Sequence, residues 1–284
     1  MRERPRITIV GAGNLGTALA TCLHGAGYAI DQIVFRESRA SRRKASRLAQ
    51  IVGARAVAMT HARIDAEVVW LCVPDDAIAE VVRALGPKAD WARKVVLHSS
   101  GALTSDELAM LRRSGAHGAS VHPMMTFVAG SQPSLVGVPF AIEGDAAAVR
   151  ASRAIVKGLG GKAYSIRAQD KVAYHSWGTF ASPLLTALLA TTEQVADAAG
   201  VHRRDAKRRM LPILQQTLAN YAALDAAGSF SGPIVRGDLE TIRRHLQVLR
   251  KVPAADEVYA ALAKAAVRYL PGKRKRLVQE LLND

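Results

Sequence analysis

Two polar segments, HSSG at 98–101 and HPMM at 122–125, each follow an apolar run in the first half of the chain. Histidine titrates near neutral pH and can give or take a proton, and a serine hydroxyl can orient an oxygen or nitrogen of a bound molecule. The residues expected in a reactive site are His98 and Ser100 as catalytic groups and His122 and Pro123 as substrate contacts. For each imidazole, a turn histidine bonded only to backbone is the alternative.

A second set of reactive side chains begins where the sequence becomes helical. Lys171 and His175 lie four residues apart and Ser182 follows seven residues later, so all three share one face of a helix. A lysine or histidine on that face can protonate an oxygen or nitrogen. We expect Lys171 or His175 to be the catalytic acid and Ser182 to contact the substrate. The alternatives are a lysine in solvent and a histidine packed between helices.

A glycine-punctuated segment, SGPIVRGD at 231–238, carries a further cation in the helical half. The Arg236 guanidinium can bind a carboxylate through two parallel hydrogen bonds, and the neighbouring glycines let backbone come close. We therefore expect Arg236 and Asp238 to contact the substrate. An ion pair between these two residues that only fixes the loop is the alternative.

The segment GAGNLG at 11–16 matches the dinucleotide-binding pattern G-x-G-x-x-G. It follows an apolar run and opens a helical pattern, which is the context that this motif requires. The first glycine permits a tight turn, the second lets backbone approach a pyrophosphate, and the third packs the helix against the sheet. The helix N-terminus then favours the negative charge. The expected cofactor contacts in this turn are Gly11, Gly13, Asn14, Leu15 and Gly16.

Arg36 lies twenty residues after Gly16, where NAD-binding proteins place an acidic residue for the ribose 2′-hydroxyl. A cation at this position suits a 2′-phosphate, so the sequence favours NADP(H) over NAD(H) as the cofactor. Glu37 would still serve a ribose if the strand ended one residue later. The further cofactor contacts that we expect are Arg36, Ser38, Arg39, Val73 and Pro74.

The elements that must position these residues differ between the two parts of the chain. Apolar runs at 6–10, 32–36, 67–73, 94–100, 119–122, 138–145 and 162–168 alternate with helical patterns at 14–26, 39–50, from 75, and at 146–161. This alternation is typical of a parallel sheet with crossover helices. Later patterns are helical only, at 171–199 with a kink at Pro183, 203–226, 237–250, 254–270 and 273–282. The sequence predicts an α/β fold, with a Rossmann-type, mostly parallel sheet in residues 1–168 and an all-helical domain in residues 169–284.

Composition narrows the possible partners of this chain of 284 residues. Its two cysteines lie in apolar stretches, which favours a reducing, cytoplasmic compartment. The uncharged stretch 7–30 resembles a membrane anchor in length, but its glycines and polar residues suit a strand, turn and helix. The net charge of +15 is spread over several clusters with few aromatic residues, so we expect no nucleic-acid partner as a primary role. We also expect no membrane partner and no metal site.

Six motifs together resemble a group of bacterial proteins that join a Rossmann-like N-terminal half to a C-terminal helical domain of unknown function. They are GAGNLGTALA, LCVPDDAI, HSSGAL, VHPMMTF, the K-x-x-x-H pair at 171–175 and SGPIVRGD, and they span nearly the whole chain. The layout is also similar to the superfamily of 6-phosphogluconate dehydrogenase, β-hydroxyacid dehydrogenases, pyrroline-5-carboxylate reductase and ketopantoate reductase. The resemblance implies an NADP-linked oxidoreductase, an analogy from fold, that forms a homodimer through its helical domain.

Two positions depart from the patterns of these relatives. The β-hydroxyacid dehydrogenases carry K-x-x-x-N with lysine as acid and base, so Lys171 matches while His175 stands in place of asparagine. The bacterial group tends to have Ser-Asn where this chain has Ser182-Pro183.

We predict an NADP(H)-dependent oxidoreductase that moves hydride to or from a small carbonyl, hydroxyacid or imine compound. The alternative is a binding protein that senses NADP(H) or a metabolite without turnover.

Overall fold

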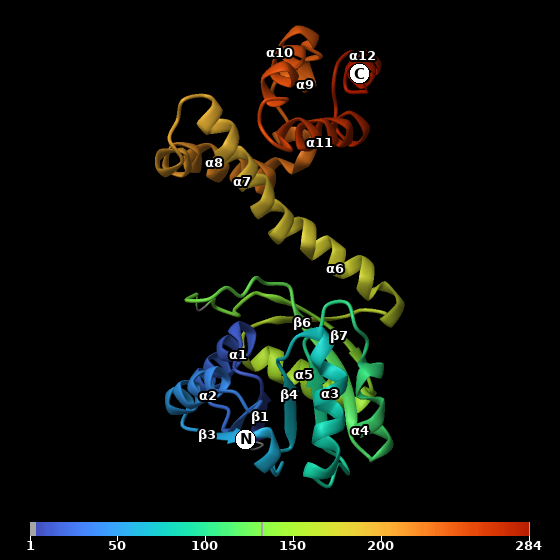
Figure 1. Ribbon diagram of the computed structural model, residues 1–284. Helices are drawn as coiled ribbons and strands as arrows, with labels where there is room; N and C mark the ends of the chain where they lie inside the picture. The colour runs from blue at the N-terminus through green and yellow to red at the C-terminus, as the bar shows by residue number, and fades with distance from the viewer. Residues whose placement is uncertain (1–3, 132, 284) are drawn as a thin grey trace. The chain divides into compact units, whose positions relative to one another are not determined.

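The structure is a computed structural model that describes residues 4–131 and 133–283 (Figure 1). The chain forms two compact units, the first ending at Thr179 and the second beginning at Phe180. This boundary falls later than the expected one at 168/169, because helix α6 (Lys171–Thr179) buries Lys171 and Tyr174 in the first unit. Residues 1–3 of the first expected domain and residue 284 of the second lie outside the described residues.

The first unit is built on one eight-stranded sheet with the strand order β3-β2-β1-β4-β5-β6-β7-β8. All neighbouring strands are parallel except β6 and β7. The strands are β1 (Ile7–Val10), β2 (Ile30–Phe35), β3 (Arg55–Ala58), β4 (Val68–Leu71), β5 (Val95–His98), β6 (His117–Pro123), β7 (Pro139–Gly144) and β8 (Lys162–Ser165). Because β1, β2, β4, β5 and β6 are parallel, the residues that follow them gather at one edge of the sheet.

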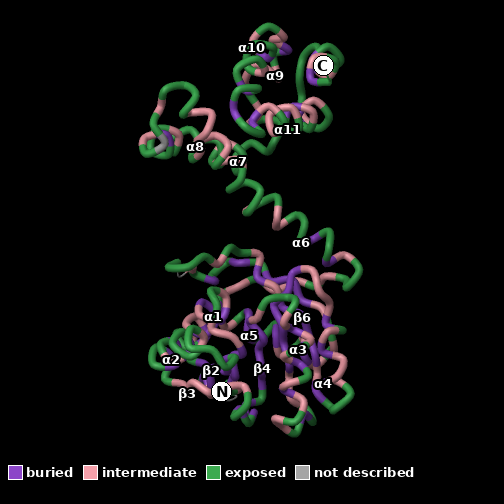
Figure 2. Tube along the Cα trace, viewed as in Figure 1, coloured by how far each residue is buried: buried purple, intermediate pink, exposed green. Residues whose placement is uncertain are grey.

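Helices cover both faces of this sheet. They are α1 (Asn14–Gly25), α2 (Arg39–Val52), α3 (Asp75–Leu85), α4 (Ala109–Arg113) and α5 (Ala146–Gly158). Helices α1, α2 and α5 share one apolar cluster with the sheet, and α3 and α4 share the other. Along β4, Val68 and Trp70 belong to the first cluster and Val69 and Leu71 to the second, as the alternation of strand side chains requires. Figure 2 shows the buried residues of this unit concentrated along its strands.

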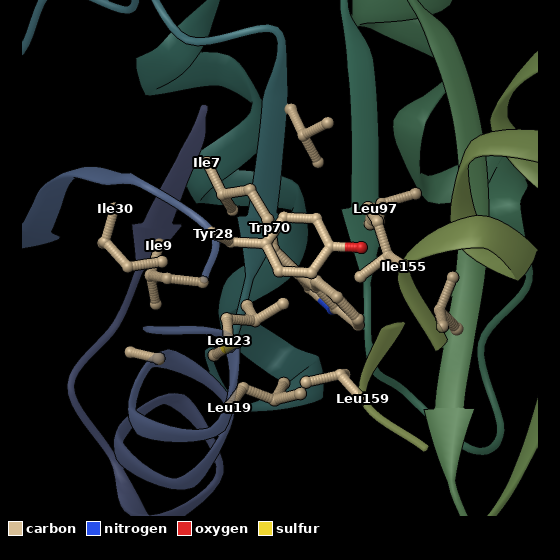
Figure 3. Packing of buried hydrophobic residues seen from close by; sticks show 14 of the residues in the cluster. Ile7, Ile9, Leu19, Leu23, Tyr28, Ile30, Trp70, Leu97, Ile155 and Leu159 are labelled. Carbon is tan, nitrogen blue, oxygen red and sulfur yellow. The ribbon is translucent and has the colours of Figure 1, made fainter. Parts of the chain in front are cut away.

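Trp70 lies at the centre of the first cluster, among side chains from strands and from α1 and α5 (Figure 3). It is fully buried, and its indole Nε1 donates a hydrogen bond to Ser99 Oγ at 2.8 Å. The polar atom of this large side chain is therefore satisfied inside the core. The same bond ties the end of β5, and with it the HSSG turn, to the packed interior.

The second unit consists of helices. They are a π-helical turn (Phe180–Leu184), α7 (Leu185–Ala198), α8 (Arg203–Ser229), α9 (Pro233–Arg236), α10 (Leu239–Leu249), α11 (Ala255–Tyr269) and α12 (Lys275–Leu281). Two small apolar clusters, around Ile242 and around Leu249, hold α9 to α12 together. Helices α7 and α8 contribute a single buried side chain from the described residues, Ala206.

The predicted fold class is confirmed, both for the mostly parallel sheet and for the helical C-terminal region. The predicted helix over 171–199 is helical throughout, but its central turn, which contains Pro183, has the π pattern. The sequence patterns missed β3, α4 and α9, which are four or five residues long. Within the described ranges, none of the helices combines the length and the hydropathy that a bilayer span needs.

Candidate active site

The turn between β1 and α1 uses its three glycines for different purposes. Gly11 has a φ of +103°, a left-handed conformation, and a Cβ there would lie 2.5 Å from Cys72 O. A Cβ at Gly16 would collide with Gly11 O, so α1 can pack this closely only through glycine. A Cβ at Gly13 would meet nothing within 4 Å. The space over Gly13 is open, and a ligand can approach its backbone.

The N-terminus of α1 is open to an anion. Its N-cap, Gly13, supplies no side-chain hydrogen bond, and its first turn contains no acidic residue. Asn14 Nδ2 donates instead to Phe127 O at 3.2 Å, and Leu15 packs half-buried against the core. The first N–H groups of a helix have no partners within it and, with the helix dipole, favour a phosphate.

A cavity of about 700 Å³ lies at the carboxyl ends of β1, β2 and β4. The predicted cofactor contacts that line it are Gly11, Gly13, Arg36, Val73 and Pro74. Ser41 and Lys44, from the first turns of α2, line it as well. Ser38 and Arg39 are not among its lining residues, because Ser38 is the N-cap of α2 and its Oγ accepts the Ser41 N–H at 3.1 Å.

Acidic side chains also border this cavity. Glu37 accepts the Thr60 N–H at 2.8 Å, and its hydrogen bonds with Thr60 lower the pKa of the Glu37 carboxyl. Asp76 and Glu80 of α3 are the further acidic lining residues. The cationic groups are Arg36, directly after β2, and Lys44 of α2. The open glycine turn fits a pyrophosphate, and this pair of cations fits one more phosphate.

His98, at the end of β5, is completely buried and bonded on both ring nitrogens. Nε2 donates to Thr104 O at 2.9 Å, and Nδ1 accepts the Ser100 N–H at 3.2 Å. These partners fix a neutral ring with its hydrogen on Nε2. Burial is the main cause that lowers the pKa of His98 to about 4, and the charge of Lys171 contributes to this shift. In this structure both ring nitrogens of His98 are therefore bonded within the protein.

The hydroxyl of Ser100 is likewise hydrogen-bonded to other groups of the protein. Its hydroxyl donates to Asp75 Oδ2 at 2.7 Å and accepts the N–H groups of Ala102 and Leu103 at 3.2 and 2.8 Å. One donor and two acceptor positions exhaust what a hydroxyl can offer. In this structure the hydroxyl of Ser100 therefore shapes the turn after β5.

Lys171 is the most deeply placed charge of the site. Its side chain is 0% exposed, and Nζ donates to Ser100 O at 3.0 Å and to Ser120 Oγ at 2.6 Å. Burial lowers the pKa of Lys171 to about 8, against the opposing effect of Glu143 and Asp75. In this arrangement the ammonium joins β5 to β6 and does not reach the surface of the first unit.

Gly101, His122 and His175 lie close together near Lys171. A Cβ at Gly101 would lie 2.5 Å from His175 Cδ2 and 2.9 Å from His122 Nε2. The rings of His122 and His175 meet edge to face with their centroids 6.1 Å apart. His122 Nδ1 is 2.8 Å from the hydroxyl of Tyr174, which is buried. His175 is the exposed member of this group, and its imidazole can exchange a proton with a bound molecule.

The other predicted substrate contacts are distributed over both units. Pro123 is buried at the end of β6, next to His122. Ser182 lies in the π-helical turn of the second unit. Asp238 caps α10, accepting the Thr241 N–H at 3.1 Å and the Thr241 hydroxyl at 2.7 Å. Its hydrogen bonds with Thr241 lower the pKa of Asp238, and the charge of the exposed Arg236, two residues earlier, adds to this effect.

Ser41, Lys44, Ser120 and Tyr174 are among the residues of the site that were not predicted from the sequence. Helical spacing could have indicated Lys44, since it lies one turn after residues 39–41. No sequence signal indicated Tyr174, because its partner His122 is 52 residues away in the chain.

Each of the two parts of the chain matches a known protein family model. Residues 1–123 match the Rossmann-like domain, and residues 138–266 match a domain of unknown function, DUF2520. No curated protein matches the chain.

Solved structures share the fold. A provisionally described NADP oxidoreductase from Bacteroides fragilis has a TM-score of 0.79 and 23% identity over 92% of this chain and 97% of its own. A protein from Thermotoga maritima has a TM-score of 0.69 and 24% identity over 98% of each chain. A reductive aminase from Aspergillus terreus, in complex with NADPH and ethyl-5-oxohexanoate, has a TM-score of 0.63 and 19% identity over 94% of each chain. At these identities the likeness establishes the fold.

Proposed function

Since the chain joins a Rossmann-like domain to a DUF2520 domain, we propose that it is an NADP(H)-dependent oxidoreductase acting on a small carbonyl, hydroxyacid or imine compound. The observation that carries the proposal is the cavity at the carboxyl ends of β1, β2 and β4, with the open backbone of Gly13 on its wall. The shared fold with a reductive aminase that binds NADPH supports the same reading.

The residues of the glycine turn and of the cavity wall divide between the pyrophosphate and the 2′-phosphate of the cofactor. Gly11, Gly13 and Gly16 would seat the pyrophosphate at the start of α1. Arg36 and Lys44, with the hydroxyl of Ser41, would hold the 2′-phosphate. Glu37 is held by Thr60, which leaves the two cations to set the preference for NADP(H) over NAD(H).

The reduction needs a hydride and a proton. Bound NADPH would supply the hydride to the substrate carbon. The oxygen or nitrogen of the double bond takes up the proton, which we assign to His175 because it is the exposed member of the convergence at Gly101. Lys171, Ser100 and His98 hold the turn that carries Gly101 in place through bonds among themselves and to backbone.

The remaining contacts belong to the same proposal. His122 and Pro123 are the proposed substrate contacts in the first unit. That Ser182 contacts substrate and that Arg236 binds a carboxylate stay predictions from the sequence. Asp238 is assigned to the cap of α10 instead. We further propose that the chain works as a homodimer formed through its helical unit.

The cofactor assignment is tested by following the fluorescence of NADPH and NADH during titration of the protein. We expect NADPH to bind more tightly than NADH, and Arg36→Asp and Lys44→Gln each to weaken NADPH binding about tenfold or more, as lost charge-assisted hydrogen bonds would. Binding of NADH should change little. Arg43→Gln is the matched control, because this exposed arginine lies on the same helix but does not line the cavity.

Turnover is tested with ethyl-5-oxohexanoate, alone as a ketone and with allyl amine as an imine precursor, by the consumption of NADPH. If neither NADPH nor NADH binds at millimolar concentration, the oxidoreductase assignment is wrong. If NADPH binds and a broad set of carbonyl and imine compounds is not reduced, the protein binds the cofactor without this chemistry.

A further inference from the structure

The contact between His122 and Tyr174 has no part in the function proposed so far. His122 lies on β6 and Tyr174 on α6, and Nδ1 of the imidazole is 2.8 Å from the phenol oxygen. The two rings meet edge to face with centroids 5.4 Å apart. A tyrosine buried by its ring and bonded through its hydroxyl holds the imidazole in one orientation.

That orientation directs the other nitrogen of His122 to the convergence at Gly101. His122 Nε2 would lie 2.9 Å from a Cβ built on Gly101, and His175 Cδ2 would lie 2.5 Å from the same point. A side chain at position 101 would collide with both rings, so glycine here lets Nε2 of His122 and the exposed His175 lie side by side. A substrate group that reaches His175 therefore also lies beside His122.

The protonation states of the pair are set by burial. Burial is the main cause that lowers the pKa of His122 to about 4, and the charges of Lys171 and His175 contribute to this shift, so the ring is neutral at neutral pH. Burial also raises the pKa of Tyr174, so its hydroxyl keeps its hydrogen. A neutral imidazole carries one hydrogen, and the partner of Nδ1 decides which nitrogen bears it.

We propose that Tyr174 is a positioning residue that donates its hydrogen bond to Nδ1 of His122 and so keeps the hydrogen of this imidazole on Nε2. Nε2–H then donates to the oxygen or nitrogen of the substrate double bond and makes His122 a catalytic residue. This inference rests on the proposed reductase function.

The reaction step balances with these groups. Hydride forms the new C–H bond, and the π electrons of the C=O or C=N bond move onto oxygen or nitrogen. That atom receives a proton from the imidazolium form of His175, whose N–H bond breaks to leave a neutral ring. His122 remains neutral throughout and stabilises the developing charge through its hydrogen bond.

The tautomer can be measured without any activity. In protein with ¹⁵N-labelled histidine, nuclear magnetic resonance distinguishes Nε2–H from Nδ1–H rings, and His122→Asn identifies the signals. We expect His122 of the wild type to be the Nε2–H tautomer and Tyr174→Phe to remove that preference. Tyr259→Phe is the matched control, because Tyr259 contacts His245 through its hydroxyl and edge to face in the same way and makes no contact with His122.

Kinetics supply the second readout with the same two probe substrates. We expect Tyr174→Phe to lower kcat about tenfold, with unchanged binding of NADPH, and Tyr259→Phe to retain kcat. A wild-type ring with its hydrogen on Nδ1, or an unchanged kcat in Tyr174→Phe, would overturn the inference. If the wild type binds NADPH and reduces neither probe, the proposed function fails, while the spectra still decide the tautomer.

Discussion

Gly101 has no side chain, and the imidazoles of His122 and His175 border the space that one would fill. We expect Gly101→Ala to displace both rings and to lower kcat at least tenfold on any substrate that the wild type reduces. NADPH affinity should stay within about twofold, because Gly101 does not line the cofactor cavity. Steady-state kinetics and cofactor titration measure the two effects separately.

Gly25→Ala provides the comparison for this substitution. A Cβ at Gly25 would meet nothing within 4 Å, so this variant should match the wild type in both assays. Equal activity of Gly101→Ala and Gly25→Ala would show that the two imidazoles do not act at Gly101.

His98 makes the stability of the first unit sensitive to acid. Its pKa is lowered to about 4 in the folded protein from 6.5, so the unfolded chain binds more protons between these values. The free energy of unfolding should therefore fall as the pH drops from 6.5 to 4, by about 3 kcal/mol from this residue. Urea unfolding across this range tests the sign.

His98→Gln is the variant that isolates this effect. Glutamine does not titrate, so its free energy of unfolding should fall less steeply over the same pH range, whatever its stability at pH 7. A decline as steep as that of the wild type would mean that the buried His98 does not govern the acid sensitivity.

The role of a site residue could be predicted from the sequence where its partners lie close to it along the chain. The G-x-G-x-x-G turn and Arg36 are set by short-range spacing, and the structure places them on one cavity. The saturation of Ser100 was not visible in the sequence, because its donor bond goes to Asp75, 25 residues away. Sequence shows that a residue can do chemistry, whereas tertiary partners decide whether its atoms remain free.

At the level of elements, two glycines of the turn from β1 to α1 should affect different properties, one the binding of NADPH and the other the free energy of unfolding. We expect Gly13→Ala to leave the free energy of unfolding within about 0.5 kcal/mol of the wild type, because its Cβ would enter open space. The same methyl group would occupy the approach of the pyrophosphate and weaken NADPH binding about tenfold or more.

Gly16→Ala should behave in the opposite order. Its Cβ would collide with Gly11 O and crowd the Cβ of Cys72, so we expect a loss of about 1–3 kcal/mol in the free energy of unfolding. Denaturant unfolding and NADPH titration of both variants test the contrast. A Gly13→Ala protein that binds NADPH as the wild type does would remove the pyrophosphate from this turn.

The elements themselves were predicted where they are long or strongly patterned. Strands β1, β2, β4 and β5 are apolar runs buried on both faces, and such runs stand out in a sequence. Strand β3 begins with the exposed Arg55 and is not fully buried, so its four residues carry no comparable pattern. The π-helical turn at Pro183 depends on how the chain accommodates a missing N–H, and periodicity does not report that.

At the level of the whole molecule, the helical unit leaves large apolar side chains without cover from its own helices. On α8, Ile213, Leu218, Tyr221 and Leu224 are each more than half exposed. Large apolar side chains exposed along one helix are typical of interaction sites, and we propose a second copy of the chain as the partner. Sedimentation equilibrium should therefore give about twice the chain mass at micromolar concentration.

Ile213→Glu tests which surface forms the dimer. A carboxylate at this exposed position should shift the equilibrium to monomer, because pairing would bury its charge. Ile51→Glu is the control, since Ile51 is exposed on α2 of the first unit. A wild type that sediments as a monomer, or equal effects of the two substitutions, would contradict the proposed interface.

The unequal demands on the three glycines of the β1–α1 turn have an evolutionary consequence. Gly11 and Gly16 are required by the packing of backbone, so any descendant that keeps this fold must keep them. Only a bound dinucleotide would constrain Gly13, since nothing in the protein occupies the space above it. In a lineage that no longer binds the cofactor, position 13 would therefore be the first of the three glycines to be substituted. A substitution there beside an intact Gly11 and Gly16 would indicate that cofactor binding was lost while the fold was kept.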